Sequence, residues 1–320
     1  MKLAAVLTPL SDYHLRLAAQ TGVDEIVVRY PGPDPSRFDE IQQRVESFGL
    51  RVGVVEGYLP IDAIKLGRDD GTELQLMKDL VRHLGRRGVP MICYNFMAGT
   101  DWIRTSVDAP ERGGSTTTAF ELSELMHARI PGREPYGDTE LERAAGRDGL
   151  WAALEAFLHE IIPVAEEAGV VMAMHPDDPP LPRLLGNDRI MHDVAGFERL
   201  VNLVPSPNNK IAFCQGSFAE MGVDIPETIR RLGPHIAYVH FRDVRGTAES
   251  FVESWQDNGQ TDMVAAMRAY REVGFDGPMR PDHVPMMEGE EGGEPGYTML
   301  GRLFAFGYIR ALIQSTESNP

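Results

Sequence analysis

The chain has 320 residues, of which 42% are hydrophobic and 25% are charged, and it carries a formal net charge of −17. This length suits one large barrel or two ordinary domains, and the composition excludes a low-complexity chain. The acidic balance repels phosphate backbones and so disfavours nucleic acid as a partner. No apolar run approaches the length of a membrane span, so we expect no membrane partner.

Short apolar runs alternate along the chain with longer segments of helical periodicity. The predicted strands lie at residues 2–8, 25–30, 51–57, 90–96, 170–175, 210–215, 235–241 and 277–283. The predicted helices lie at residues 15–22, 37–49, 73–88, 150–169, 197–204, 227–233, 263–274 and 298–314. Such alternation favours a parallel sheet with helical crossovers, and eight units predict an α/β fold of the (β/α)8 TIM-barrel type, with residues 1–320 as a single domain. The alternative, a doubly wound open sheet with an extra domain, lacks a glycine-rich dinucleotide motif after the first strand.

One polar segment, residues 97–148, interrupts this regular alternation after the fourth predicted strand. In a barrel it would lie over the mouth formed by the carboxyl ends of the strands, where long loops are usually functional. We interpret it as a lid-like excursion that contacts substrate; the alternative is a decorated surface loop.

The last four predicted strands end on residues that can bind a metal. These residues are His175, Cys214, His240 and Asp282. Each residue alone has an ordinary structural explanation, such as a buried histidine, a small apolar thiol or a helix-capping carboxylate. In a barrel, however, all four strand ends meet at one mouth. The set therefore predicts a site for a divalent transition metal.

The two cysteines have different expected roles. Cys93 lies within a predicted strand and is expected to belong to the core, whereas Cys214 ends a strand. Two cysteines form no disulfide framework, which fits the reducing cytoplasm. The N-terminal segment has one lysine and no convincing cleavage site, so we interpret it as a first strand and expect a cytoplasmic protein.

Several neighbours of the predicted ligands are candidates for catalysis or substrate binding. His283 follows Asp282 and could transfer a proton, and a phenol such as Tyr297 could do the same or simply pack on the barrel rim. Arg280 could pair with a carboxylate. Further candidates for substrate contact are Asn95, Arg104 and Asp177. Asp177 and Asp178 could instead orient the proline-rich loop that carries them.

Seven motifs, in order along residues 50–310, resemble those of the mannonate dehydratase family. They are ICYNFM, DWIRT, MHPDDPP, the strand-end Cys214, HFRDVRG, RPDH and PGY. The resemblance implies a xylose-isomerase-like barrel that converts D-mannonate to 2-keto-3-deoxy-D-gluconate with a divalent metal, Mn²⁺ first, or Co²⁺, Ni²⁺ or Zn²⁺. It also implies His175, Cys214, His240 and Asp282 as ligands, with His283 and Tyr297 as catalytic residues. The first strand, KLAAVLT, lacks the aromatic and arginine residues common at that place in the family.

Other functions stay open on the sequence. The same barrel and metal could isomerise or epimerise a sugar, the dehydratase could act on a different aldonate, or an inactive barrel could bind a sugar acid or a protein. The expected partner is a small sugar acid. A homodimer is one assembly that the chain could form, because barrels of this kind often pair.

Overall fold

A computed structural model describes residues 1–99, 101–127 and 146–316 of the chain. Eight parallel strands close into a barrel in the order β1-β14-β11-β10-β7-β4-β3-β2, and pairing of Lys2 with Pro278 joins the first strand to the last. The barrel strands are β1 (Lys2–Val6), β2 (Glu25–Val28), β3 (Arg51–Glu56), β4 (Met91–Tyr94), β7 (Val171–Met174), β10 (Asn209–Cys214), β11 (Ile236–His240) and β14 (Pro278–Arg280). The predicted TIM barrel is confirmed, and each of its strands falls within or next to a predicted one.

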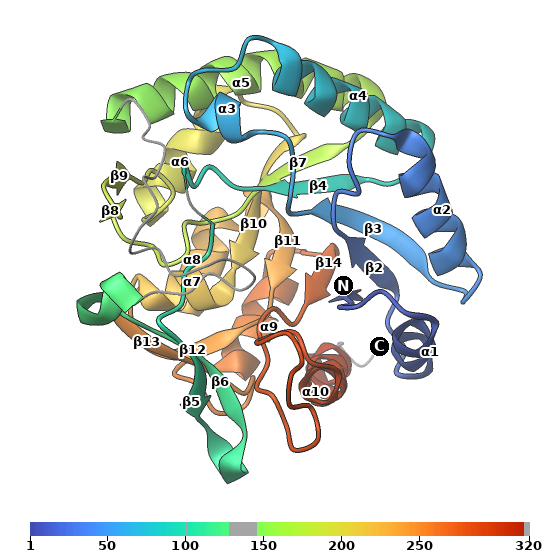
Figure 1. The fold of residues 1–320 in the computed structure, drawn as a ribbon, viewed down its shortest axis with the longest axis vertical. Coiled ribbons are helices and arrows are strands. Elements are labelled where there is room, and N and C mark those ends of the chain that lie inside the picture. Colours follow the sequence, from blue (N-terminus) through green and yellow to red (C-terminus); the bar gives the residue numbers. More distant parts are fainter. Residues whose placement is uncertain (100, 128–145, 317–320) are drawn as a thin grey trace.

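Helices surround the strands on the outside of the barrel (Figure 1). They are α1 (Asp12–Gln20), α2 (Pro35–Glu46), α3 (Asp62–Lys65), α4 (Thr72–Arg86), α5 (Gly146–Ala168), α6 (Val194–Leu203), α7 (Gln215–Glu220), α8 (Ile225–Leu232), α9 (Met263–Glu272) and α10 (Met299–Thr316). Short 3-10 turns lie at η1 (Arg112–Gly114), η2 (Leu122–His127) and η4 (Gly233–His235). Many helices begin at a side chain that accepts a hydrogen bond from the first turn, such as Asp34, Asp193 and Asp262. In the described part of the chain, no helix combines the length and apolarity needed to cross a bilayer.

The barrel strands divide their side chains between two apolar layers. In β1, Leu3 and Ala5 join the large core between strands and helices, whereas Ala4 and Val6 join a smaller cluster inside the barrel. This follows from the two-residue period of a strand, which places successive side chains on opposite faces. Cys93 belongs to the inner cluster, as a core residue would.

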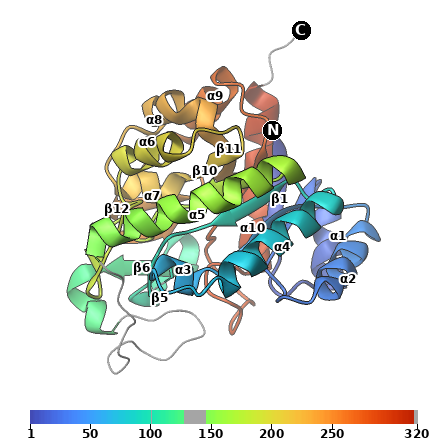
Figure 2. The same cartoon turned by 90° about the horizontal axis from the view of Figure 1, so that it is seen from above.

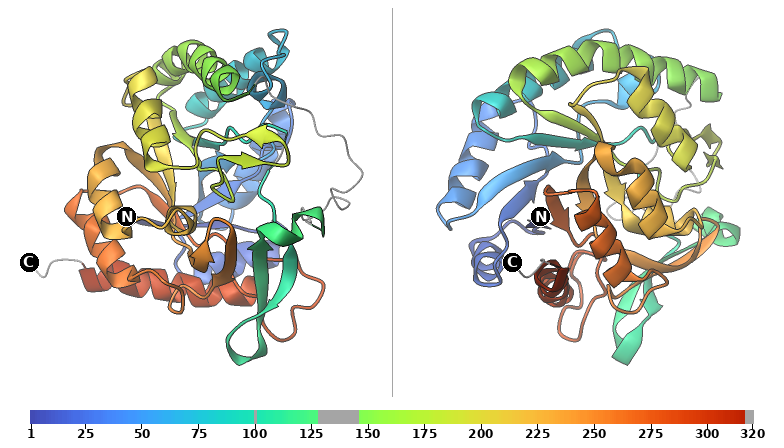
Figure 3. Two further views of the ribbon diagram at one scale, coloured as in Figure 1. Left: turned by 90° about the vertical axis from the view of Figure 1, so that its left-hand side faces the viewer. Right: turned by 180° about the vertical axis from the view of Figure 1, so that it is seen from behind.

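A second sheet, which the sequence analysis did not predict, lies beside the barrel. Its antiparallel strands run in the order β12-β13-β6-β5. They are β5 (Ser106–Pro110), β6 (Thr116–Glu121), β12 (Asp243–Thr247) and β13 (Ser250–Ser254). A two-stranded sheet of β8 (Arg183–Leu184) and β9 (Asn187–Asp188) follows β7. Figure 2 shows β5 and β6 on the same side of the molecule as α3, and Figure 3 shows them standing apart from the barrel strands.

The four-stranded sheet joins two segments far apart in sequence. β5 and β6 come from the predicted excursion at residues 97–148, while β12 and β13 follow β11, and Phe120 pairs with Phe251 across the junction. Residue 100 and residues 128–145 of the excursion lie outside the described residues. The described part of the excursion therefore contributes two of the four strands of this sheet, β5 and β6.

Candidate active site

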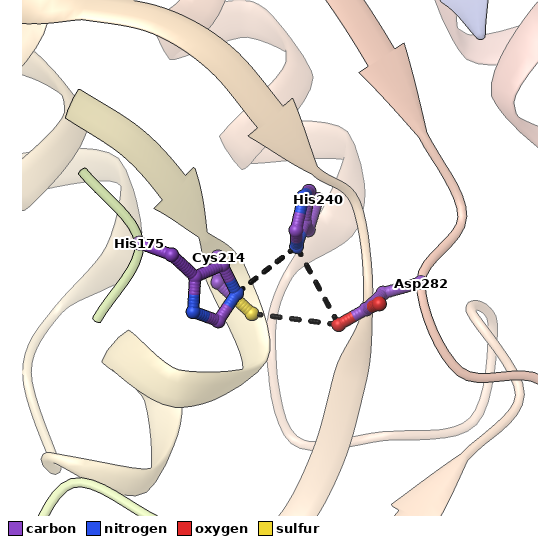
Figure 4. Close-up of side chains that lie close together, drawn as sticks. All are labelled: His175, Cys214, His240 and Asp282. Carbon is purple, nitrogen blue, oxygen red and sulfur yellow. Dashed lines mark hydrogen bonds and ion pairs between the residues drawn. The ribbon is translucent and has the colours of Figure 1, made fainter. Parts of the chain in front are cut away.

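The structure brings the four predicted metal ligands together at the carboxyl ends of β7, β10, β11 and β14 (Figure 4). One donor atom from each of His175, Cys214, His240 and Asp282 lies within 4.8 Å of the others. His175 Nε2 is 3.1 Å from His240 Nδ1, and Asp282 Oδ2 is 3.6 Å from His240 Nδ1 and 3.7 Å from Cys214 Sγ. Donors at 2.0–2.3 Å from one tetrahedral ion would lie roughly 3.3–3.8 Å apart. The spacing of the four side chains therefore fits a single bound ion.

The two histidines each turn one ring nitrogen toward the same space. His175 Nδ1 lies 2.7 Å from the carbonyl oxygen of Pro176, which can only accept, so Nδ1 carries the proton. His240 Nε2 lies 3.4 Å from a carboxylate oxygen of Glu56, which favours a proton on that nitrogen. His175 Nε2 and His240 Nδ1 then face each other, 3.1 Å apart. Nearby acidic groups raise the pKa of both histidines against the effect of burial, so a metal that binds here displaces protons from this pair. This arrangement fits a divalent metal on the observed side chains.

Cys214 is fully buried in a positive environment. Burial alone would raise the pKa of its thiol, but Arg242 and His175 outweigh burial and lower that pKa to about 5. Ser217 Oγ adds a donor 3.4 Å from Sγ. Because the thiolate is the form that binds metals, Cys214 is prepared as a ligand at neutral pH.

Buried side chains behind the proposed ligands hold Asp282 in place. Arg280 donates to Asp282 Oδ1 at 2.7 Å and to the hydroxyl of Tyr238 at 2.7 Å, and it also pairs with Glu56. Burial opposes ionisation of Asp282, but His283 and Arg280 hold the pKa of its carboxyl well below the usual range. Arg280 was expected to contact substrate. Its N–H groups already donate to Asp282, Tyr238 and Glu56, and its side chain also lines the cavity.

His283 and Tyr297, the predicted catalytic pair, line a cavity together with two of the four proposed ligands, His175 and Asp282. Their ring centroids are 5.3 Å apart, and the ring of Trp102 lies 4.7 Å from that of His283. Burial raises the pKa of Tyr297, so its phenol is protonated at neutral pH. Gly296 has a φ of 78°, and a Cβ there would lie 3.2 Å from the imidazole of His283. A glycine in the PGY motif is therefore needed to seat Tyr297 beside His283.

Arg104 lies behind His283 rather than in the cavity. Its side chain is fully buried, donates to Asp178 Oδ1 at 2.6 Å, and pairs with Glu253 at 2.5 Å. Arg242 pairs with Asp178 at 2.8 Å, and it also contacts Glu220. The two arginines, Asp178 and Glu253 thus form a buried network behind His283, and Glu220 touches this network through Arg242.

The two adjacent aspartates of MHPDDPP point to different places. Asp178 lines the cavity, and Arg104 and Arg242 overcome the effect of burial and lower the pKa of its carboxyl. Asp177 does not line the cavity. Its Oδ2 accepts a hydrogen bond of 2.8 Å from the backbone N–H of Met191. The structure therefore gives Asp177 the loop-orienting contact, and brings Asp178 to the cavity instead.

The ends of β2, β3 and β4 supply further side chains to the cavity. Asn95, one of the predicted substrate contacts, lines it together with Arg29, Glu56 and Tyr58. The guanidinium carbon of Arg29 lies 5.8 Å from the ring centroid of Tyr58 and 5.4 Å from that of Tyr297. The sequence analysis did not single out Arg29. Its position directly after β2, where strand ends form the mouth of a barrel, could have identified it.

Comparisons with known proteins agree with this geometry. A family model described as D-mannonate dehydratase (UxuA) matches residues 10–319. Mannonate dehydratase 2 of Halalkalibacterium halodurans is 34% identical over 299 residues, which cover 87% of this chain and 86% of that protein. Mannonate dehydratase of Streptococcus uberis is 35% identical over 300 residues, with the same two shares of 87% and 86%.

Solved structures show the same relationship. The crystal structure of mannonate dehydratase from Streptococcus suis serotype 2 is 30% identical, has a TM-score of 0.87, and covers 99% of this chain and 95% of that chain. A xylose isomerase domain protein from Planctomyces limnophilus, at 13% identity, has a TM-score of 0.60 and covers 98% of this chain and 96% of that chain. The second likeness is one of fold alone, and it makes the barrel xylose-isomerase-like.

Proposed function

Because the chain belongs to the D-mannonate dehydratase family, a family of hydro-lyases, we propose that it removes water from D-mannonate to give 2-keto-3-deoxy-D-gluconate. The observation that carries this proposal is that two kinds of group lie next to each other at the carboxyl ends of the barrel strands. Four metal-binding side chains lie within 4.8 Å of one another, and His283 and Tyr297 line the cavity beside them. That combination suits removal of a proton next to a carboxylate and loss of a hydroxyl.

We propose His175, Cys214, His240 and Asp282 as the ligands of a divalent ion, with Mn²⁺ first and Co²⁺, Ni²⁺ or Zn²⁺ as alternatives. When bound, the ion supplies Lewis-acid stabilisation of the negative charge that develops beside the substrate carboxylate. A thiolate ligand must stay reduced, which fits the cytoplasmic location expected from the sequence.

His283 and Tyr297 would exchange the two protons that the reaction moves. One proton leaves C2 of the substrate, and one must reach the departing C3 hydroxyl. Burial keeps the phenol of Tyr297 protonated, so that side chain suits donation. Asn95 and Arg29, which also line the cavity, would bind the sugar hydroxyls, and Arg280 would hold Asp282 in position, because its donors already serve Asp282, Tyr238 and Glu56.

The test is an assay of the purified protein with Mn²⁺ and D-mannonate. We expect a 2-keto-3-deoxy acid to accumulate, and we expect removal of the metal with a chelator to abolish its formation. Absence of product from D-mannonate and from related aldonates would contradict the proposal. Exchange of solvent deuterium into a sugar without loss of water would favour an isomerase or epimerase. The homodimer stays a prediction, to be checked by light scattering on the eluted protein.

A further inference from the structure

Glu253 contacts the proposed catalytic histidine from outside the barrel. It lies on β13, where it is paired with Val244 of β12 in the four-stranded sheet. Its Oε1 is 2.9 Å from Nδ1 of His283, and neither side chain is more than 3% exposed. We infer that Glu253 is a positioning residue that fixes the tautomer and orientation of His283. The catalytic consequence of this inference rests on the proposed function.

The chemistry of the contact determines which nitrogen carries the proton. A carboxylate has no hydrogen to donate, so the Nδ1–H of His283 must donate to Glu253. Nε2 is then the nitrogen left to exchange a proton with substrate, and it lies 3.9 Å from Oδ1 of the proposed ligand Asp282. Carboxylate–imidazole pairs of this kind hold both tautomer and ring orientation in other enzymes.

Two arginines lie beside Nδ1 of His283, and without the carboxylate of Glu253 they would favour the other tautomer of the ring. Arg104 Nη2 lies 3.4 Å from His283 Nδ1, and Arg242 Nη1 lies 3.5 Å from it. A guanidinium can only donate, so these two neighbours alone would favour a lone pair on Nδ1 and a proton on Nε2. Glu253, in closer contact, reverses that preference.

Glu253 is itself held in its ionised form. Arg104 pairs with Oε1 at 2.5 Å, and Arg242 Nε lies 3.2 Å from Oε2. Burial alone would raise the pKa of this carboxyl, but Arg242, His283 and Arg104 outweigh burial and lower it. The sheet outside the barrel therefore delivers a charged, fixed acceptor to the catalytic centre.

The experiment compares Glu253→Gln with Glu220→Gln as a matched control. Glu220 is equally buried and also contacts Arg242, but it has no contact with His283. Burial raises the pKa of the Glu220 carboxyl, and Glu220→Gln changes a contact of Arg242 while leaving the contact between Glu253 and His283 in place. Three quantities are measured on each metal-loaded protein, namely kcat and KM for D-mannonate, metal content, and ¹⁵N shifts of labelled histidines with diamagnetic Zn²⁺ in the site. The His283→Gln variant assigns the signals of His283.

For Glu253→Gln we expect kcat to fall about 100-fold, with KM within about threefold of the wild type and unchanged metal content. We also expect the proton of His283 to move from Nδ1 to Nε2. Glu220→Gln should keep kcat within about threefold. If Glu253→Gln does not fold, Glu253→Asp retains the charge but withdraws the carboxylate by about 1.5 Å, and the same fall in kcat is expected.

The inference is overturned if Glu253→Gln keeps its kcat, or if Glu220→Gln loses as much activity as Glu253→Gln. A protein without activity on D-mannonate would contradict the proposed function and leave the ¹⁵N measurement to decide the inference. In that case, a switch of the protonated nitrogen supports it, and an unchanged tautomer overturns it.

Discussion

The two halves of the barrel give different kinds of side chain to one mouth. The ends of β7, β10, β11 and β14 carry His175, Cys214, His240 and Asp282, the cluster that fits a metal ion. The ends of β2, β3 and β4 carry further side chains that line the cavity, namely Arg29, Glu56 and Asn95. The fold thus separates the residues proposed for the chemistry, on the later strands, from those proposed to bind substrate, on the earlier ones.

The two cysteines show how local charge creates this difference. Both thiols are buried and both lie on barrel strands. Burial and the nearby Glu56 raise the pKa of Cys93 to about 11, whereas Arg242 and His175 lower that of Cys214 to about 5 against the effect of burial. The same residue type is therefore a protonated thiol in one half and a proposed metal ligand in the other.

Replacing each cysteine with alanine should have opposite effects on metal binding. Cys214→Ala should lose the metal and reduce kcat/KM by about 10³-fold or more, because the remaining ligands cannot replace the thiolate. Cys93→Ala should retain its metal and lose about 1 kcal/mol of stability through the missing side-chain packing. Metal analysis by mass spectrometry, together with the dehydration assay, checks both variants. Equal metal content in the two variants would contradict the division.

Glu56 is the residue that connects the two halves. It comes from β3 but lies 3.4 Å from His240 Nε2 and pairs with Arg280. Glu56→Gln should weaken metal affinity about 10- to 100-fold, as loss of a carboxylate partner of a metal-binding histidine does. Calorimetric titration of the metal-free protein measures this change, and an unaltered affinity would show that the contact does not orient His240.

Arg29→Ala tests the recognition half. Its guanidinium lines the cavity, with one ion pair, to Glu56, at 3.9 Å. Loss of a charged hydrogen bond to substrate costs about 1.5–3 kcal/mol, so we expect KM to rise roughly 10-fold or more while metal content stays the same. Steady-state kinetics and metal analysis provide the measurements. A loss of metal without a change in KM would show that Arg29 supports metal binding and does not bind substrate.

The smallest expected effect concerns pH. Burial alone would lower the pKa of His175, but Cys214 outweighs it and the pKa is raised. Burial and Arg280 would lower the pKa of His240, but Glu56 and Asp282 outweigh them and raise it well above the usual value. A histidine must lose its proton to bind a metal, so apparent metal affinity should rise with pH, by up to about tenfold per unit for each displaced proton, and level off only above the raised pKa values of both histidines. Cys214 adds no dependence above its pKa of about 5. Titrations between pH 6 and 9 that show a flat or falling affinity would contradict this expectation.

The sequence was sufficient for the barrel and for the meeting of the four proposed ligands. Strand–helix alternation gives the order of the strands, and parallel strands bring His175 and Asp282 to one edge although they lie far apart in the chain. The sequence could not place the buried carboxylates, because a partner such as Glu253 is chosen by tertiary contacts and not by spacing.

Two particular residues show where the sequence reasoning ended. In MHPDDPP, no periodicity distinguishes Asp177 from Asp178, since a proline-rich loop has no regular face. In the segment 243–254, Phe251 and Glu253 lie two residues apart and both contact Arg104, as residues on one face of a strand do. That alternation was a usable signal for β13, but it was short and lay outside the regular strand–helix repeat.

The four-stranded sheet has a consequence for anyone who exchanges loops between barrels. Its two hairpins come from the segments after β4 and after β11, and each covers an edge of the other. A graft of one hairpin alone would leave an open edge ready to pair with another chain, and a graft without β13 would lose Glu253. The two segments therefore have to be transferred together if the sheet and its contact with His283 are to be kept.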